Sequence, residues 1–188
     1  MVSNRRDNPT KQPLPPQVEV VTDAVMDAER AVIGSLLIDP SALLHVRNTL
    51  PAEAFYTIKL RWIYEAIIAL ADRGVAADFL TVSDELAGRG QIDEIGGDFA
   101  IMELANAMPT PLHIEYYAQI VTRSWKQRET VKLADHILRA ALDGIAAARG
   151  ANAPWPAFHQ IAHVQCIDPA DIPRFAELGV VANIQPLW

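Results

Sequence analysis

The chain has 188 residues, of which 51% are hydrophobic and 21% are charged, a balance that is ordinary for a globular protein. No stretch approaches the ~18 consecutive apolar residues of a membrane span, and the N-terminus lacks the apolar segment of a secretory signal. We therefore expect a cytoplasmic protein that does not engage a membrane. The single cysteine, Cys166, excludes an internal disulfide and a zinc site built from thiolates. The net charge of −7 argues against direct nucleic-acid binding, which relies on Lys and Arg, and favours a protein partner.

Residues 1–22 are rich in proline and polar side chains and show no periodic apolar face. Such a composition cannot bury enough surface to offset the entropy lost on ordering. The sequence predicts a disordered arm over this range.

The segment 23–144 reads as a succession of helices. In DAERAVIGSLLIDP the apolar residues recur at helical spacing, and Asp39-Pro40 ends that helix. A short helix is predicted in SALLHVRNTL and a strong one in IKLRWIYEAIIALADRG, with Gly74 as its C-terminal stop. Asp78 is placed to cap FLTVSDELAGRGQ, and another helix follows in DFAIMELANAMP. The residues expected in the core are Leu36, Leu37, Leu43, Phe55, Trp62, Ile63, Ile67, Leu86, Leu104 and Tyr117.

The longest predicted helix runs from His113 to Asp143, a stretch without Gly or Pro in which apolar residues recur every three or four positions. Two interpretations are open. The helix buries one stripe on its own domain, or the stripe is a seam for another helix, as in a coiled coil interrupted by Arg128. The surface expected to meet a partner consists of Tyr117, Val121, Trp125, Val131 and Leu138.

Residues 145–157, rich in Ala, Gly and Pro, are predicted to be a linker. In 158–188, two short apolar runs flank a helix-sized stretch that begins at Asp168-Pro169. Strand, helix, strand is a β-α-β-like fragment, which normally belongs to a larger parallel sheet. The predicted fold class is mainly α: a compact multi-helix domain, a long C-terminal helix and this short fragment.

Most catalytic signatures are absent from the sequence. No Lys follows a Gly, so the phosphate-cradling P-loop is missing. His159 and His163 fall on one face of a strand-like run, about 13 Å apart, which is too far to share one metal ion. We therefore expect no catalytic residue, no cofactor and no metal site, with His163 only a vestigial metal candidate.

Four segments between about 26 and 144 resemble a known family. They are DAERAVIGSLLIDPSAL, EAFYTIKLRWIYEAIIALADRG, DFLTVSDELAGRGQIDEIGG and LANAMPTPLHIEYYAQIVTRSWKQRE. In order and spacing they resemble the N-terminal domain of bacterial replicative DNA helicases, the DnaB family. The resemblance implies a helical domain whose long helix forms a hairpin with the next helix and pairs subunits. It also implies a collar on a hexamer with which primase and loader proteins work, and no nucleotide hydrolysis by the domain itself.

After LRAALDG the chain departs from that family, because the second hairpin helix, the linker and the ATPase are not found in it. The segment 158–188 instead resembles a piece of the metal-dependent amidohydrolase superfamily, whose members are TIM barrels. His163 falls where that superfamily places a metal-site histidine, whereas Ala162 stands where a Glu is usual. One strand-helix-strand unit cannot close a barrel of ~250 residues.

Three hypotheses from different classes follow. We favour a non-catalytic interaction and oligomerisation module of the replicative helicase type, acting in DNA replication and the primosome and truncated before the motor. The alternatives are an ATP-driven helicase, which the missing P-loop disfavours, and a truncated or fused amidohydrolase-related protein. The expected partners are a second copy or other helicase subunits, with primase or the helicase loader as further partners. We expect the far half of the long helix to be exposed and to self-associate weakly, with the tail loosely docked.

Overall fold

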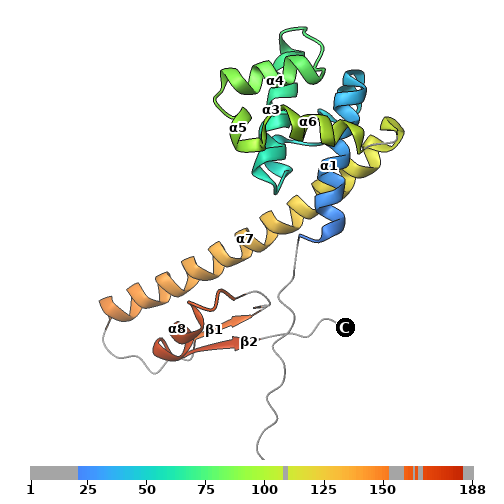
Figure 1. The fold of residues 1–188 in the computed structure, drawn as a ribbon. Coiled ribbons are helices and arrows are strands. Elements are labelled where there is room, and N and C mark those ends of the chain that lie inside the picture. The colour runs from blue at the N-terminus through green and yellow to red at the C-terminus, as the bar shows by residue number, and fades with distance from the viewer. Residues whose placement is uncertain (1–20, 108–109, 153–158, 163, 165–166, 184–188) are drawn as a thin grey trace, which may run out of the picture.

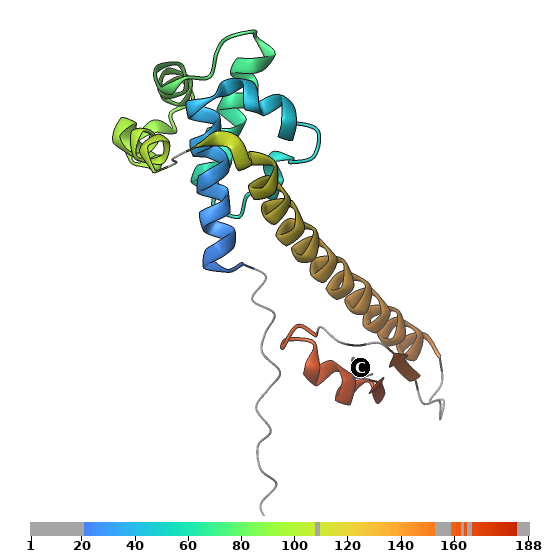
Figure 2. The same cartoon turned by 90° about the vertical axis from the view of Figure 1, so that its right-hand side faces the viewer.

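The computed structural model describes residues 21–107, 110–152, 159–162, 164 and 167–183. Helices dominate these ranges and form a compact head from which one long helix extends, with a small strand-containing unit against its far half (Figures 1 and 2). The prediction of a mainly helical fold with a long C-terminal helix is confirmed. In chain order the elements are α1 (Asp23–Ile38), η1 (Pro40–Ala42), α2 (Leu43–Val46), η2 (Ala52–Ala54), α3 (Ile58–Asp72), α4 (Phe79–Gly88), α5 (Ile92–Ile95), α6 (Gly97–Asn106), η3 (Pro111–His113), α7 (Ile114–Ala151), β1 (His159–Ala162), α8 (Ile172–Glu177) and β2 (Val180–Asn183).

Helix α1 lies at the centre of the head, which comprises α1 to α6 and the first half of α7 up to Arg128. It packs against α3, α6 and α7, so its apolar side chains are covered from several directions. Val32, Ile33 and Leu36 are completely buried there. All ten residues of the expected core lie in this cluster or pack on its rim. The helical spacing of apolar residues was therefore sufficient to identify the core.

A buried carboxylate ties α1 to the start of α3. Glu29 has no exposed surface, and its two oxygens accept hydrogen bonds from the backbone N–H groups of Tyr56 (2.5 Å) and Thr57 (3.1 Å). These groups precede the first turn of α3, where the helix leaves N–H groups without intrahelical partners and where negative charge is favoured. Glu29 thus caps a helix that lies far along the chain.

Helix α4 begins with the cap that the sequence predicts. The Thr81 N–H donates to the Asp78 carboxylate at 2.9 Å, and the Asp78 N–H donates to the Thr81 hydroxyl at 3.0 Å, so both residues satisfy each other's backbone. The hydrogen bond from the Thr81 backbone is the main reason that the pKa of Asp78 lies below its ordinary value. Gly90, just beyond the helix, has a φ of 69°, which favours glycine at this turn.

Helix α7 is longer than the sequence predicts. It continues through Gly144 and ends at Ala151, so the expected linker 145–157 begins as helix. The alanines of IAAARGA favour helix enough to outweigh the two glycines. Its first half lies in the head, and the far half, 129–151, projects from it (Figure 1). Within the described ranges no helix, α7 included, has a stretch long and apolar enough to cross a membrane.

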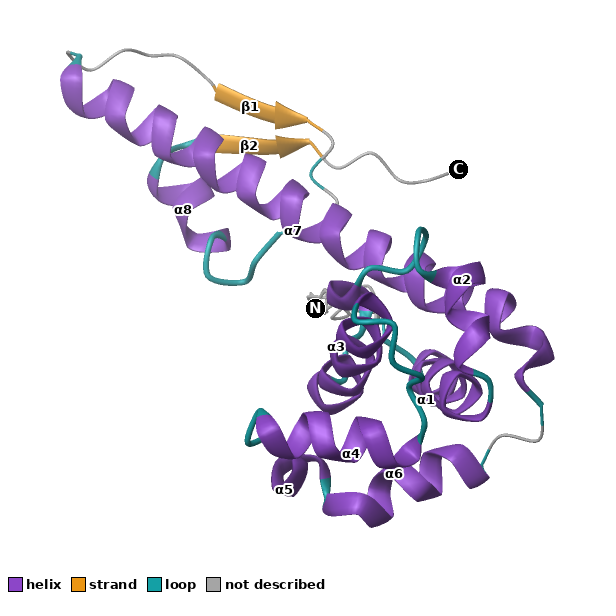
Figure 3. Ribbon diagram, turned by 90° about the horizontal axis from the view of Figure 1, so that it is seen from above, coloured by secondary structure: helices purple, strands orange, loops and turns teal. Residues whose placement is uncertain are grey.

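The described residues of the tail, 159–162, 164 and 167–183, pack against the far half of α7. Strands β1 and β2 are parallel neighbours, with His159 opposite Val180, and they run side by side next to α7 (Figure 3). Apolar side chains from α7 and from the tail together form a second core, separate from that of the head: Leu138, Leu142, Val164, Phe175 and Val180. The prediction that this face of α7 is exposed therefore has to be corrected, because the tail covers it.

Candidate interaction surface

The five residues that the sequence assigned to one partner-facing surface lie in three environments. Val121 is completely buried in the head core, and Tyr117 and Trp125 pack on the rim of that core. Val131 is partly buried at the start of the projecting half, and Leu138 is buried under the tail. They do not form one exposed face in this chain. The apolar stripe of α7 packs into the core of the head in its first half and into the second core, under the tail, in its far half.

Two apolar residues outside the predicted surface are exposed to solvent instead. Leu133 and Ile137 are 59% and 60% exposed, one helical turn apart in the projecting half of α7. Ala140 and Gly144 continue the same spacing of three and four residues, and both are exposed. We call these four residues the α7 seam. The spacing of these four residues is present in the sequence, but the apolar stripe that is buried in the structure gives the stronger helical pattern.

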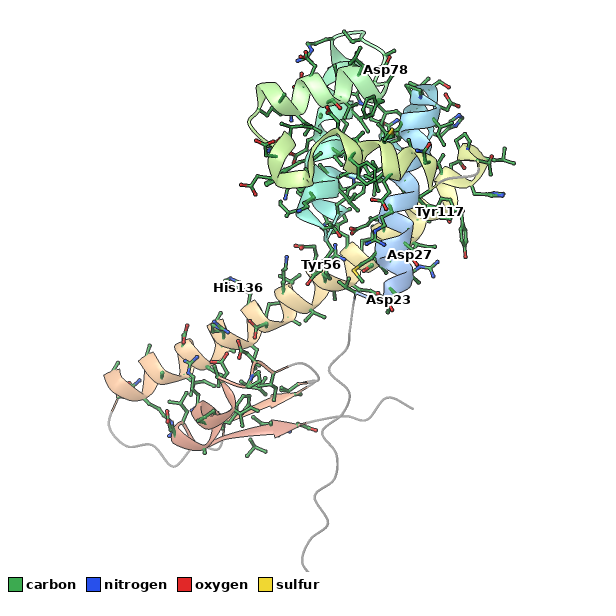
Figure 4. All side chains as sticks on the ribbon, viewed as in Figure 1. Asp23, Asp27, Tyr56, Asp78, Tyr117 and His136 are labelled. Carbon is green, nitrogen blue, oxygen red and sulfur yellow. The ribbon has the colours of Figure 1, made fainter. Side chains whose placement is uncertain are left out.

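Arg128 marks the point where α7 leaves the head. Its guanidinium donates to the backbone carbonyl of Ala54 at 2.6 Å and to the Ser124 hydroxyl at 2.9 Å. It also lies 5.6 Å from the centre of the Tyr56 ring, within reach of a cation–π interaction. Figure 4 labels Tyr56 at this junction. Arg128, which the sequence suggested only as an interruption of a seam, fixes α7 to the head.

A groove of about 910 Å³ lies beside the middle of α7, next to Asn48 and Thr49. The Thr122 hydroxyl donates to the Thr49 carbonyl at 3.2 Å, which holds its two walls together. Arg123 and Lys126 line the groove. Most of its lining residues are of polar type, but more of the surface that they present to it is apolar than polar. The groove and the α7 seam lie on successive parts of the same helix.

Two arginines join α7 to the tail. Arg139 of α7 lies 2.9 Å from the Asp168 carboxylate and 3.3 Å from that of Asp171. Arg174 of α8 donates to Asp171 at 2.9 Å and also to Asp143 of α7. We call Arg139, Asp143, Asp168, Asp171 and Arg174 the tail latch.

Acidic neighbours raise the pKa of both arginines above the ordinary value. For Arg139 the charge of Asp135 is the largest cause, followed by that of Asp171. For Arg174 the hydrogen bonds to Asp171 and then Asp143 dominate. Both guanidinium groups therefore stay charged at neutral and at moderately alkaline pH.

The described residues hold no group of three or more His, Cys, Asp or Glu side chains that could bind a metal ion. His163, the vestigial metal candidate, lies outside the described residues. His136 projects from α7 on the side away from the tail (Figure 4). Tyr64, the largest fully buried side chain, has its pKa raised to about 12 by burial and donates to the Leu50 carbonyl at 2.9 Å. That pair is structural.

Known proteins match the head, and one of these matches extends beyond it. A family model described as the DnaB-like helicase N terminal domain matches residues 22–123. The replicative DNA helicase DnaB of Geobacillus stearothermophilus is 40% identical over 112 residues, which are 60% of this chain and 25% of that protein. The replicative DNA helicase DnaB of Mycobacterium leprae is 32% identical over 160 residues, which are 85% of this chain and 25% of that protein.

A solved structure agrees with these relatives. The crystal structure of the N-terminal domain of DnaB helicase from Mycobacterium tuberculosis superimposes with a TM-score of 0.58 at 31% identity. The superposition covers 68% of this chain and 88% of that one. The chain thus spans about a quarter of the length of these curated relatives. It is similar to most of the solved domain.

Proposed function

Because the chain belongs to the DnaB-like helicase N-terminal domain family, we propose that it is a non-catalytic interaction and oligomerisation module of the replicative helicase type. The observation that carries the proposal is the α7 seam. Leu133 and Ile137 lie more than half exposed on a helix that projects clear of its own head. Exposed apolar side chains at such spacing are characteristic of helices that meet another helix.

The proposed partner is a second copy of the chain or another helicase subunit. Ala140 and Gly144 have small or absent side chains, so a facing helix can approach closely, and no atom lies near the position of a Cβ on Gly144. Leu133 and Ile137 then supply the buried apolar area. Primase or a helicase loader is a further proposed partner, and the proposal places the module in the cytoplasm and in DNA replication at the primosome.

Nucleotide hydrolysis and direct nucleic-acid binding form no part of the proposal. The matched region of the relatives is their N-terminal domain, and this chain carries no Gly-Lys pair of a P-loop. Its net charge of −7 also disfavours binding to a phosphate backbone. A protein-binding role therefore fits the head better than a nucleotide site does.

The resemblance of the tail to amidohydrolases remains a second candidate. The parallel β1-α8-β2 arrangement is the local topology that the resemblance predicts. The same arrangement occurs throughout α/β proteins, so it does not single out a hydrolase. A titration with Zn²⁺ followed by assays on amide and ester substrates tests this candidate, and turnover that depends on His163 would support it.

The experiment for the proposed function is sedimentation velocity of the whole chain over a wide concentration range. We expect self-association that the double variant Leu133→Glu/Ile137→Glu abolishes. The matched control is Leu44→Glu/Leu80→Glu, because these leucines are 78% and 72% exposed on short helices of the head. Equal association of the two double variants would refute the α7 seam as the contact.

A further inference from the structure

Ion pairs join the tail to α7, and each of the two contributes an arginine to them. Arg139 belongs to α7 and meets the tail carboxylates of Asp168 and Asp171, whereas Arg174 belongs to the tail and meets Asp143 of α7. The Asp171 side chain, only 6% exposed, lies between the two arginines. Its Oδ2 is buried and lacks a hydrogen bond, although Arg139 Nε is 3.3 Å away. Asp171 is thus held chiefly by charge on that side.

The apolar part of this contact is small. Its buried members are Leu138 and Leu142 of α7 and Val164, Phe175 and Val180 of the tail. Two strands and a single short helix bury too little area for independent stability. The docked arrangement therefore depends on α7 as its supporting layer and on the tail latch. The latch residues other than Asp171 are 27–65% exposed, so dissolved salt reaches and screens most of their ion pairs.

Docking of the tail changes what α7 offers to a partner. Leu138 and Leu142 are covered by the tail, while Leu133 and Ile137 are exposed on a different face of the helix. Ile137 and Leu138 are neighbours in sequence and therefore point about 100° apart around the helix axis. Release of the tail would expose the covered pair as a second apolar face of α7, and a second face can bury additional area against another copy of the chain.

We propose that the tail latch is an electrostatic regulator of self-association, in which the docked tail masks the Leu138 face of α7 from a second copy of the chain. Salt or loss of a latch charge releases the tail, and the released chain associates more strongly. This proposal rests on the proposed function for its partner. The docking step itself is independent of it, since the latch lies within one chain.

Amide hydrogen exchange of the whole chain tests the docking step. We compare Arg139→Gln with Lys132→Gln at about 0.05 M and about 0.5 M salt. Both changes remove one positive charge from the projecting half of α7. Lys132, however, forms its ion pair with Glu129 of the same helix, at 2.8 Å. We expect exchange at the amides of β2 and α8 to rise about fivefold in Arg139→Gln at low salt. The same rise is expected in the unaltered chain at high salt, and Lys132→Gln should match the unaltered chain.

Sedimentation of the same samples tests the masking step. Arg139→Gln should associate at about fivefold lower concentration than Lys132→Gln. Equal tail exchange in the two variants would overturn the latch, even when the chain self-associates. Faster exchange without stronger association would overturn the masking. A chain that remains monomeric in every variant, with tail exchange still responding to Arg139→Gln, refutes the proposed function instead of the docking step.

Discussion

The carboxylate of Glu29 accepts a hydrogen bond from the backbone N–H of Thr57 across 28 positions of sequence, with no solvent access to the glutamate. A second bond from the Tyr56 N–H, at 2.5 Å, uses the other oxygen. One side chain of α1 thereby sets where α3 begins and how the two helices meet. Without this acceptor, the N–H groups of Tyr56 and Thr57 lose their hydrogen-bond partner inside the head.

Glu29→Gln should lower the free energy of unfolding by about 2 kcal/mol, because the amide keeps only one acceptor oxygen and turns an N–H₂ toward a donor. The loss of negative charge at the start of α3 adds to the effect. Urea unfolding followed by circular dichroism measures it. Glu53→Gln, at a residue whose side chain is 62% exposed, is the control and should be nearly neutral. Similar midpoints for the two variants would contradict the capping role.

Tyr64 predicts a stability change at alkaline pH. Burial raises the pKa of its hydroxyl from about 10 to about 12, so the native state holds that proton more tightly than the unfolded state does. The associated stability is present below about pH 10 and is lost as the pH rises through about 12. We expect Tyr64→Phe to lower stability at neutral pH by about 1 kcal/mol and to remove this alkaline step.

The measurement is urea unfolding at a series of alkaline pH values, combined with phenolate absorbance. Tyr56→Phe serves as the control, because Tyr56 is 60% exposed and its replacement should leave the alkaline step in place. An alkaline transition of the same size in Tyr64→Phe would assign the step to another group.

Arg128→Ala should lower the free energy of unfolding of the head by about 1–2 kcal/mol, because the Ala54 carbonyl loses a charged donor and the Tyr56 ring loses its cation. Arg123→Ala is the matched control on the same helix, since Arg123 lines the groove beside α7 and the described residues give it no ion pair. Thermal unfolding of both variants provides the comparison. An equal loss of stability in the two variants would mean that Arg128 has no special role at this junction.

A chain ending at Gly144 should keep the urea midpoint of the head nearly unchanged. Among the described residues, the head core and the second core share no buried residue, and α7 contributes to both. Circular dichroism of the shortened and whole chains gives the two midpoints. A loss of cooperativity in the shortened chain would show that the tail supports the head.

Local signals in the sequence predicted most of the head. The Asp78 cap, the stop at Gly74 and the apolar spacing of α1 and α3 act within a few residues, so pattern alone reveals them. The candidate surface was harder to predict. Leu138 is covered by side chains some 26–42 positions away, and no local pattern encodes that contact. The end of α7 was missed because glycine was weighted more than the alanines around it.

Arg128, where α7 leaves the head, and the length of the helix beyond it give the molecule a pivot and a lever arm. From Arg128 to Ala151 a helix rising ~1.5 Å per residue extends about 35 Å. A turn of about 10° at the pivot would therefore carry the far end through about 6 Å, more than the spacing between two neighbouring β-strands. A small rotation of α7 at Arg128 thus becomes a large displacement of whatever is attached to the far end of the helix, whether that is the tail or a second helix.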